Sequence, residues 1–130
     1  MGPLYGDELN TPEAGKDYGW PSVSNGEHYN NVEIPHHETT QRYERPAYYW
    51  RPAISPSGLE FYTGTLFSDW ENDLFIGSLS SKALIRVKFD DKNIVKGDER
   101  IELNQRIRDV MTANDGSIYR NQSNSSISII

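Results

Sequence analysis

The chain has 130 residues, the size of one ordinary domain, and its eight Tyr, four Phe and three Trp argue against intrinsic disorder. The absence of cysteine excludes a disulfide scaffold and a Cys-ligated metal site, and the net charge of −6 disfavours nonspecific binding to nucleic acid or anionic membranes. No window approaches the roughly 18 apolar residues that a membrane-spanning helix requires.

Residues 1–57 contain all seven prolines of the chain, with glycine and asparagine between them. This composition predicts a long loop system with short extended pieces. A loop-rich stretch of this length is uncommon in a compact domain and usually serves a function. We therefore expect residues 1–57 to form a functional segment that depends on other parts of the protein.

Residues 58–130 have the composition of a β-structure, because short runs of branched and aromatic residues alternate with turn signals. The turn signals include "SDWEN", "DDKN", "KGD" and "NDG". The runs that predict strands are 59–64, 73–79, 83–89, 99–103, 107–113, 116–120 and 126–130. Seven short strands at this spacing indicate an antiparallel sandwich, barrel or propeller.

Two further patterns refine this prediction. In "KALIRVKFDD" apolar side chains alternate with Leu84, Arg86 and Lys88, as expected of a half-exposed strand. The segments around Gly58 and Gly116 resemble each other, since each has an aromatic residue three positions after the glycine. A repeat of about four strands is typical of propeller blades and predicts one complete blade plus most of another, although two similar hairpin turns would give the same pattern.

Five strings occur in an order that resembles the C-terminal part of the glucose/sorbosone dehydrogenase family. They are "GPLYGDELN", "GKDYGWP", "YYWRPAISPSGLEFYTG", "WENDLFIGSL" and "RIRDV" followed by "DGSIY". The resemblance implies that residues 1–130 form part of an all-β, six-bladed β-propeller, with 1–57 as the loop-rich cofactor-side segment and 58–130 as blade strands. It also implies an enzyme that oxidises aldose sugars at C1 with pyrroloquinoline quinone (PQQ) and calcium.

By this resemblance, the backbone carbonyls of Gly2 and Pro3 ligate calcium, which prefers oxygen ligands. Asp7 and Glu8 are weaker candidates as calcium carboxylates. A second calcium near residues 22–29 has no regular ligand spacing to support it.

The cofactor-binding residues that the resemblance implies are Trp50, Arg106, Arg108 and Lys82. Trp50 matches an aromatic residue that lies against the quinone. In "QRIRDV" both arginines fall on the side of the strand opposite Ile107, where planar guanidinium groups suit the carboxylates of PQQ. Some members of the family have a cofactor-binding lysine at a position that falls at about Ser80 in this chain, and Lys82 is the nearest lysine to it.

No catalytic residue is expected in this chain, because the family's histidine base lies upstream of the Gly-Pro turn. His28, His36 and His37 lie in polar loops and are predicted to be surface residues. The expected partners are an aldose sugar, an external electron acceptor and N-terminal blades of the same propeller, which would leave the 130-residue chain inactive alone. The resemblance implies a periplasmic or extracellular location, although no signal peptide is visible.

Two other interpretations remain open. The chain could be a propeller piece used for binding or assembly, in which the chemistry has been lost. The other interpretation is a self-contained small β-protein whose likeness to the family is coincidental.

Overall fold

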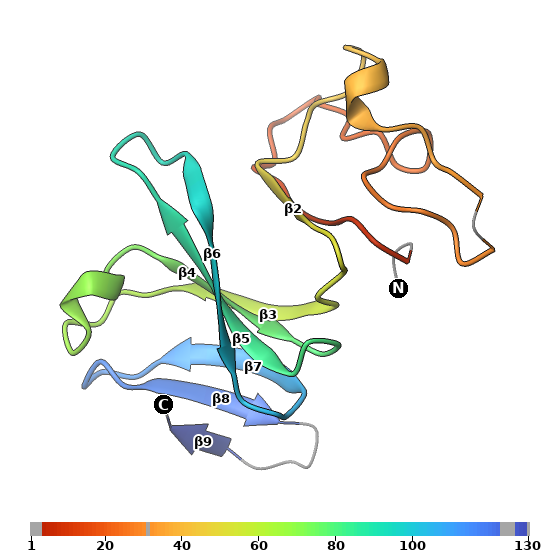
Figure 1. The fold of residues 1–130 in the computed structure, drawn as a ribbon. Coiled ribbons are helices and arrows are strands. Elements are labelled where there is room, and N and C mark those ends of the chain that lie inside the picture. The colour runs from red at the N-terminus through yellow and green to blue at the C-terminus, as the bar shows by residue number, and fades with distance from the viewer. Residues whose placement is uncertain (1–3, 31, 123–126, 130) are drawn as a thin grey trace. The chain divides into compact units, whose positions relative to one another are not determined.

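The computed structural model describes residues 4–30, 32–122 and 127–129, and the contacts divide them at Ile54/Ser55 into two compact units (Figure 1). The strands are β1 (Asp7–Leu9), β2 (Tyr48–Trp50), β3 (Pro56–Phe61), β4 (Leu74–Ser78), β5 (Ala83–Phe89), β6 (Val95–Glu102), β7 (Ile107–Thr112), β8 (Ile118–Gln122) and β9 (Ile127–Ile129). Two short 3-10 helices, η1 (His37–Thr39) and η2 (Ser68–Trp70), complete the regular structure. None of the described helices is long and apolar enough to cross a membrane.

Unit 1 is a loop system organised around one short antiparallel ladder. Strands β1 and β2 pair with Asp7 opposite Trp50, although about 40 residues separate them in the chain. Backbone hydrogen bonds from Leu4 N to Glu27 O (2.8 Å) and from Ser24 N to Pro35 O (2.9 Å) connect the surrounding loops. The loops are therefore held by specific polar contacts in place of an extended sheet.

Unit 2 contains two antiparallel sheets, one with the order β3-β4-β5-β6 and one with the order β7-β8-β9. Of the turn signals in the sequence, "DDKN" and "NDG" form hairpin turns, whereas "KGD" is wrong as a turn because it lies within β6. Asp90 Oδ1 accepts hydrogen bonds from Lys92 N (2.9 Å) and Ile94 N (2.8 Å) between β5 and β6, and Gly116, with φ +86°, turns the chain between β7 and β8. The four-stranded and three-stranded sheets match the prediction of one blade plus most of another.

The core of unit 2 lies between the two sheets. A buried cluster contains Tyr62, Phe75, Leu84, Val110 and Ile118, which come from both sheets and the loop after β3. Tyr62 is fully buried, and its hydroxyl donates a hydrogen bond to Gly116 O (2.7 Å) and accepts one from Phe67 N (3.1 Å). The strands β3 and β7, each the first in its sheet, also pack against one another.

Two other details of the sequence prediction are also wrong. Strand β5 is not half-exposed, because Ala83, Leu84 and Ile85 are all fully buried. The alignment of Gly58 with Gly116 is also out of register, since Gly58 lies within β3 while Gly116 lies in the turn before β8. The second sheet begins at β7, so the strand equivalent to β3 is the one that carries Arg108.

Candidate functional site

The two arginines of "QRIRDV" flank a buried side chain at the start of β7. Arg106 immediately precedes the strand and Arg108 lies within it, and both are exposed while Ile107 is completely buried. The pairing of β7 with β8 shifts register between Ile107 and Asp109. Because of this irregularity, Val110 takes the next buried position and Asp109 is exposed, where simple alternation would have placed it beside Ile107.

Lys82 belongs to the same end of unit 2 as the two arginines. It is exposed in the connection between β4 and β5, with a left-handed φ of 52°. Its carbonyl accepts a hydrogen bond from Leu103 N (3.2 Å), three residues before Arg106. Lys82 and Arg106 therefore lie on two connections at the same end of the sheets, and Arg108 is the second residue of β7, which begins there.

Another cation of unit 2, Arg86, is already neutralised within the fold. Its guanidinium binds Asp73 (Nε–Oδ2 2.6 Å) and Glu99 (Nη1–Oε2 3.2 Å) and lies over the ring of Trp70 at 5.3 Å. A hydrogen bond from Lys88 lowers the pKa of the Glu99 carboxyl below its usual value, with a smaller contribution from Arg86. This network is structural and leaves Arg86 unsuited to ligand binding.

In unit 1, the predicted cofactor residue Trp50 is only 3% exposed. Its ring packs edge-to-face on Tyr48, with the ring centroids 5.2 Å apart, and its carbonyl accepts a hydrogen bond from Gly6 N (3.0 Å). The predicted calcium ligands Gly2 and Pro3 lie outside the described residues. The ladder of β1 and β2 begins at Asp7, four residues after Pro3 in the sequence.

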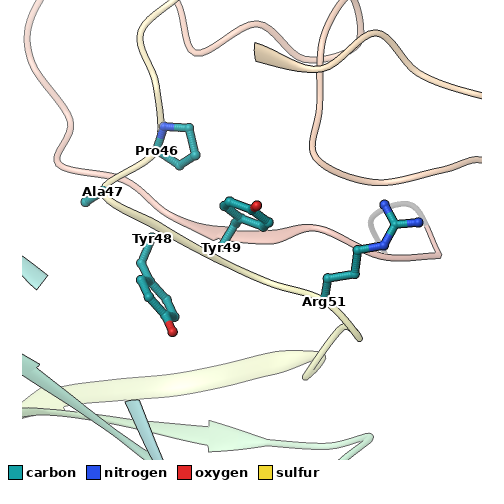
Figure 2. A pocket seen from close by; sticks show the side chains of 5 residues that line it. All are labelled: Pro46, Ala47, Tyr48, Tyr49 and Arg51. Atoms are coloured by element: carbon teal, nitrogen blue, oxygen red, sulfur yellow. The ribbon is translucent and has the colours of Figure 1, made fainter. Parts of the chain in front are cut away.

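An open hollow of about 480 Å³ lies beside Trp50 and is lined by Pro46, Ala47, Tyr48, Tyr49 and Arg51 (Figure 2). Tyr49 and Arg51 project from the same side of the strand, opposite Tyr48. Arg51 pairs with Glu27, and its guanidinium lies 4.9 Å from the ring centre of Tyr5. The sequence analysis did not single out Tyr49 and Arg51, which line this hollow on either side of Trp50 in the sequence.

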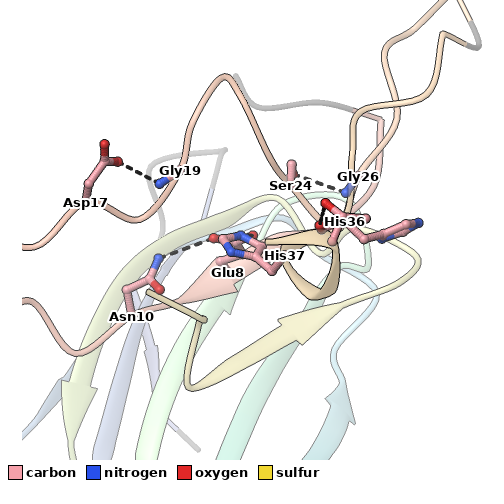
Figure 3. Close-up of polar contacts among 9 residues, drawn as sticks. Glu8, Asn10, Asp17, Gly19, Ser24, Gly26, His36 and His37 are labelled. Atoms are coloured by element: carbon pink, nitrogen blue, oxygen red, sulfur yellow. Dashed lines mark hydrogen bonds and ion pairs between the residues drawn. The ribbon is translucent and has the colours of Figure 1, made fainter. Parts of the chain in front are cut away.

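The two acidic residues of β1, Asp7 and Glu8, make specific contacts within unit 1, and Figure 3 shows Glu8 beside Asn10 and His37. Asp7 Oδ2 accepts a hydrogen bond from Ile54 N (2.9 Å). Glu8 Oε1 lies 3.1 Å from Nε2 of His37, and Glu8 Oε2 accepts a hydrogen bond from Asn10 Nδ2 (3.4 Å). Both carboxylates therefore bind neighbouring segments of the loop system.

The prediction of three surface histidines is wrong for His37, which is only 2% exposed. The Glu8 carboxylate gives Nε2 of this buried side chain a hydrogen-bond partner, whereas Nδ1 has none among the described residues. His28 and His36 are exposed, as predicted. Among the described residues, no group of three or more His, Asp or Glu side chains is arranged to hold a metal ion.

The chain matches known proteins along its whole length. The family model for glucose/sorbosone dehydrogenases matches residues 1–130. The aldose sugar dehydrogenase YliI of Escherichia coli (strain K12) is 39% identical over 122 residues, which cover 91% of this chain and 33% of that protein. A crystal structure of a glucose dehydrogenase has a TM-score of 0.88 at 38% identity, covering 99% of this chain and 38% of that one.

A more distant structure is the PQQ-bound form of an aldose sugar dehydrogenase from Streptomyces coelicolor. It has a TM-score of 0.64 at 18% identity and covers 93% of this chain and 33% of that one, so it supports the fold alone. The chain thus spans about a third of the length of these relatives. Together with the two sheets of unit 2, the matches confirm the predicted fold class, an all-β part of a β-propeller. The chain belongs to the glucose/sorbosone dehydrogenase family.

Proposed function

We propose that this chain is part of a quinoprotein oxidoreductase that oxidises aldose sugars at C1 with PQQ and calcium. The observation that supports this proposal is the position of Arg106 and Arg108 at the start of β7, near the backbone contact between Lys82 and Leu103. PQQ is a planar molecule with three carboxylates, and planar guanidinium groups suit carboxylates geometrically. The membership of the family supports this choice of anion.

In the proposed site, Arg106 and Arg108 hold cofactor carboxylates through charge-assisted hydrogen bonds, and Lys82 contributes a third positive charge. The resemblance to the family further implies that the carbonyls of Gly2 and Pro3 would ligate calcium and that Trp50 would be an aromatic contact of the cofactor. When bound, PQQ supplies an electrophilic quinone carbon that accepts hydride from the sugar. The described side chains therefore bind and orient, and no residue of this chain is assigned as the base.

The remaining partners follow from the same proposal. The base, the sugar contacts and the external electron acceptor are expected to involve N-terminal blades, because the chain covers only about a third of its relatives. A periplasmic or extracellular location is expected from the resemblance to the family.

Equilibrium titration with PQQ tests the proposed site. We expect the unsubstituted chain to bind PQQ, and Arg106→Ala and Arg108→Ala each to weaken binding on the order of tenfold or more, because each removes a charge-assisted hydrogen bond of about 1.5–3 kcal/mol. The control is Lys92→Ala, which removes one positive charge from the hairpin at the opposite end of β5. Equal weakening by all three substitutions would contradict the proposal, since it would indicate only a general charge effect.

A further inference from the structure

A hydrogen bond from the neighbouring sheet supports the strand segment between the two arginines. Ser57, in β3, donates its hydroxyl to the carbonyl oxygen of Ile107, with Oγ and O 2.7 Å apart. That carbonyl belongs to the peptide unit that joins Ile107 to Arg108. The orientation of this peptide unit sets the direction in which the Arg108 side chain leaves the strand. Arg106 lies on the other side of Ile107, whose position the same hydrogen bond holds.

Gly77, in β4, leaves the space that this hydrogen bond requires. A Cβ atom at Gly77 would lie 2.5 Å from Ser57 Oγ, 3.1 Å from Ile107 Cγ2 and 3.2 Å from Ile107 O. The first distance is far below ordinary van der Waals contact, so an alanine would displace the serine hydroxyl or the Ile107 carbonyl. Gly77 is thus required for close packing at this point.

The β7–β8 ladder is irregular at the same place. Its register shifts between Ile107 and Asp109, so the regular pairing that fixes backbone direction elsewhere in β7 is interrupted around Arg108. A second side-chain contact, from Thr112 N to Glu60 Oε1 (2.9 Å), holds the far end of β7 against β3. At the start of β7, between Arg106 and Arg108, the hydrogen bond from Ser57 to Ile107 O holds the strand against β3 in the same way.

We propose that Ser57 is a positioning residue for Arg106 and Arg108, and that Gly77 provides the space in which Ser57 acts. The ligand is the anionic planar cofactor of the proposed function, on which this inference rests. A structural role alone would predict that losing the hydroxyl lowers the stability of unit 2 and leaves the cofactor affinity of the folded chain unchanged. A positioning role predicts a loss of affinity in a chain that remains folded.

The experiment compares Ser57→Thr with Ser57→Val, which have almost the same shape and differ in the hydroxyl. Tyr62→Phe is the matched control, because it removes a hydrogen-bonding hydroxyl from the same unit at the opposite end of β7. PQQ affinity is measured by equilibrium titration of each folded variant. We expect Ser57→Val and Gly77→Ala to weaken binding about tenfold, a typical effect of losing an outer supporting contact, while Ser57→Thr and Tyr62→Phe bind normally.

A spectroscopic measurement reports the geometry directly. The backbone amide of Arg108 shares its peptide unit with the Ile107 carbonyl, so its ¹⁵N chemical shift responds to the hydrogen bond from Ser57. We expect this signal to move in Ser57→Val and to stay close to its original position in Ser57→Thr. Should Ser57→Val fail to fold, the smaller change Ser57→Ala takes its place in both measurements.

The outcomes separate this inference from the function on which it rests. If Arg106→Ala and Arg108→Ala weaken PQQ binding but Ser57→Val binds as tightly as Ser57→Thr, the positioning role is overturned and the proposed site stands. Weakening by Tyr62→Phe equal to that by Ser57→Val would also overturn it, since loss of stability would then explain both. If the arginine variants bind as the unsubstituted chain does, the proposed site itself fails.

Discussion

Tyr62 connects the two sheets of unit 2 through its hydroxyl, and Tyr62→Phe removes this connection with little change in shape. The hydroxyl donates to Gly116 O (2.7 Å) and accepts from Phe67 N (3.1 Å) in a residue that is completely buried. The substitution therefore leaves one carbonyl and one amide without their partner. With a net value of about 1 kcal/mol for each hydrogen bond, we expect a loss of about 2 kcal/mol in the free energy of unfolding of unit 2.

Amide hydrogen exchange measures this loss in unit 2 separately from unit 1. The slowest amides of β4 and β5 report the opening of the whole unit, because these strands contribute most of its buried residues. A loss of about 2 kcal/mol corresponds to roughly 30-fold faster exchange at these amides. Tyr119→Phe is the control, because the Tyr119 hydroxyl makes no hydrogen bond within the described part of the chain, and its exchange rates should change less than about twofold.

The reasoning would be refuted if Tyr62→Phe changed the exchange of β4 and β5 no more than the control does. That result would mean that water or a rearranged turn satisfies Gly116 and Phe67 equally well. Faster exchange confined to the β7–β8 turn would also contradict it, because the hydroxyl would then support only the turn.

Three further predictions concern other parts of the chain. Lys88→Ala should raise the pKa of the Glu99 carboxyl toward its usual value, as measured by NMR titration. Because the pKa of Glu99 is lowered in the folded chain, the stabilisation from this pair is fully present above the pKa of the unfolded state and is lost as pH falls through the pKa of the folded state. Trp50→Ala should destabilise unit 1 by about 3 kcal/mol and abolish the exchange protection of β1 amides, and retained protection would argue against the packing described. The 130-residue chain should show no glucose turnover with a dye acceptor even with PQQ and calcium, and measurable turnover would disprove the assignment of its base to other blades.

The strands of unit 2 are predictable from sequence because each is local and strongly patterned. Strand β5 occupies the predicted residues 83–89, and β7 begins at the predicted Ile107. The missed feature is burial on both sides of β5, since Leu84 is covered by residues distant in sequence. Alternation along one strand cannot show what packs on each side.

The ladder in unit 1 could not be predicted in the same way. β1 consists of Asp7, Glu8 and Leu9, and acidic residues are disfavoured in strands. It forms because Trp50 and its neighbours, far along the chain, supply the pairing backbone. The same long-range dependence explains the buried His37, whose partner Glu8 lies 29 positions away.

The candidate cofactor residues are identified by sequence strings that resemble the family. Side-chain alternation along the strand predicts only part of their arrangement. Alternation around Ile107 correctly gives two exposed arginines, but the irregular pairing that displaces Asp109 has no sequence signal. The proximity of Lys82 to this region depends on the bond between its carbonyl and Leu103 N, which joins two connections that sequence reasoning treats separately.

The contact between β3 and β7 bears on how such propellers tolerate recombination. Ser57 and Glu60 from one sheet bind backbone atoms of the next, so adjacent blades share a junction whose two halves must match. A chimaera that exchanges the segment after Ile54 as one piece keeps this junction intact. A crossover between β6 and β7 would join unmatched partners, and blades donated to a new enzyme should therefore be exchanged in pairs.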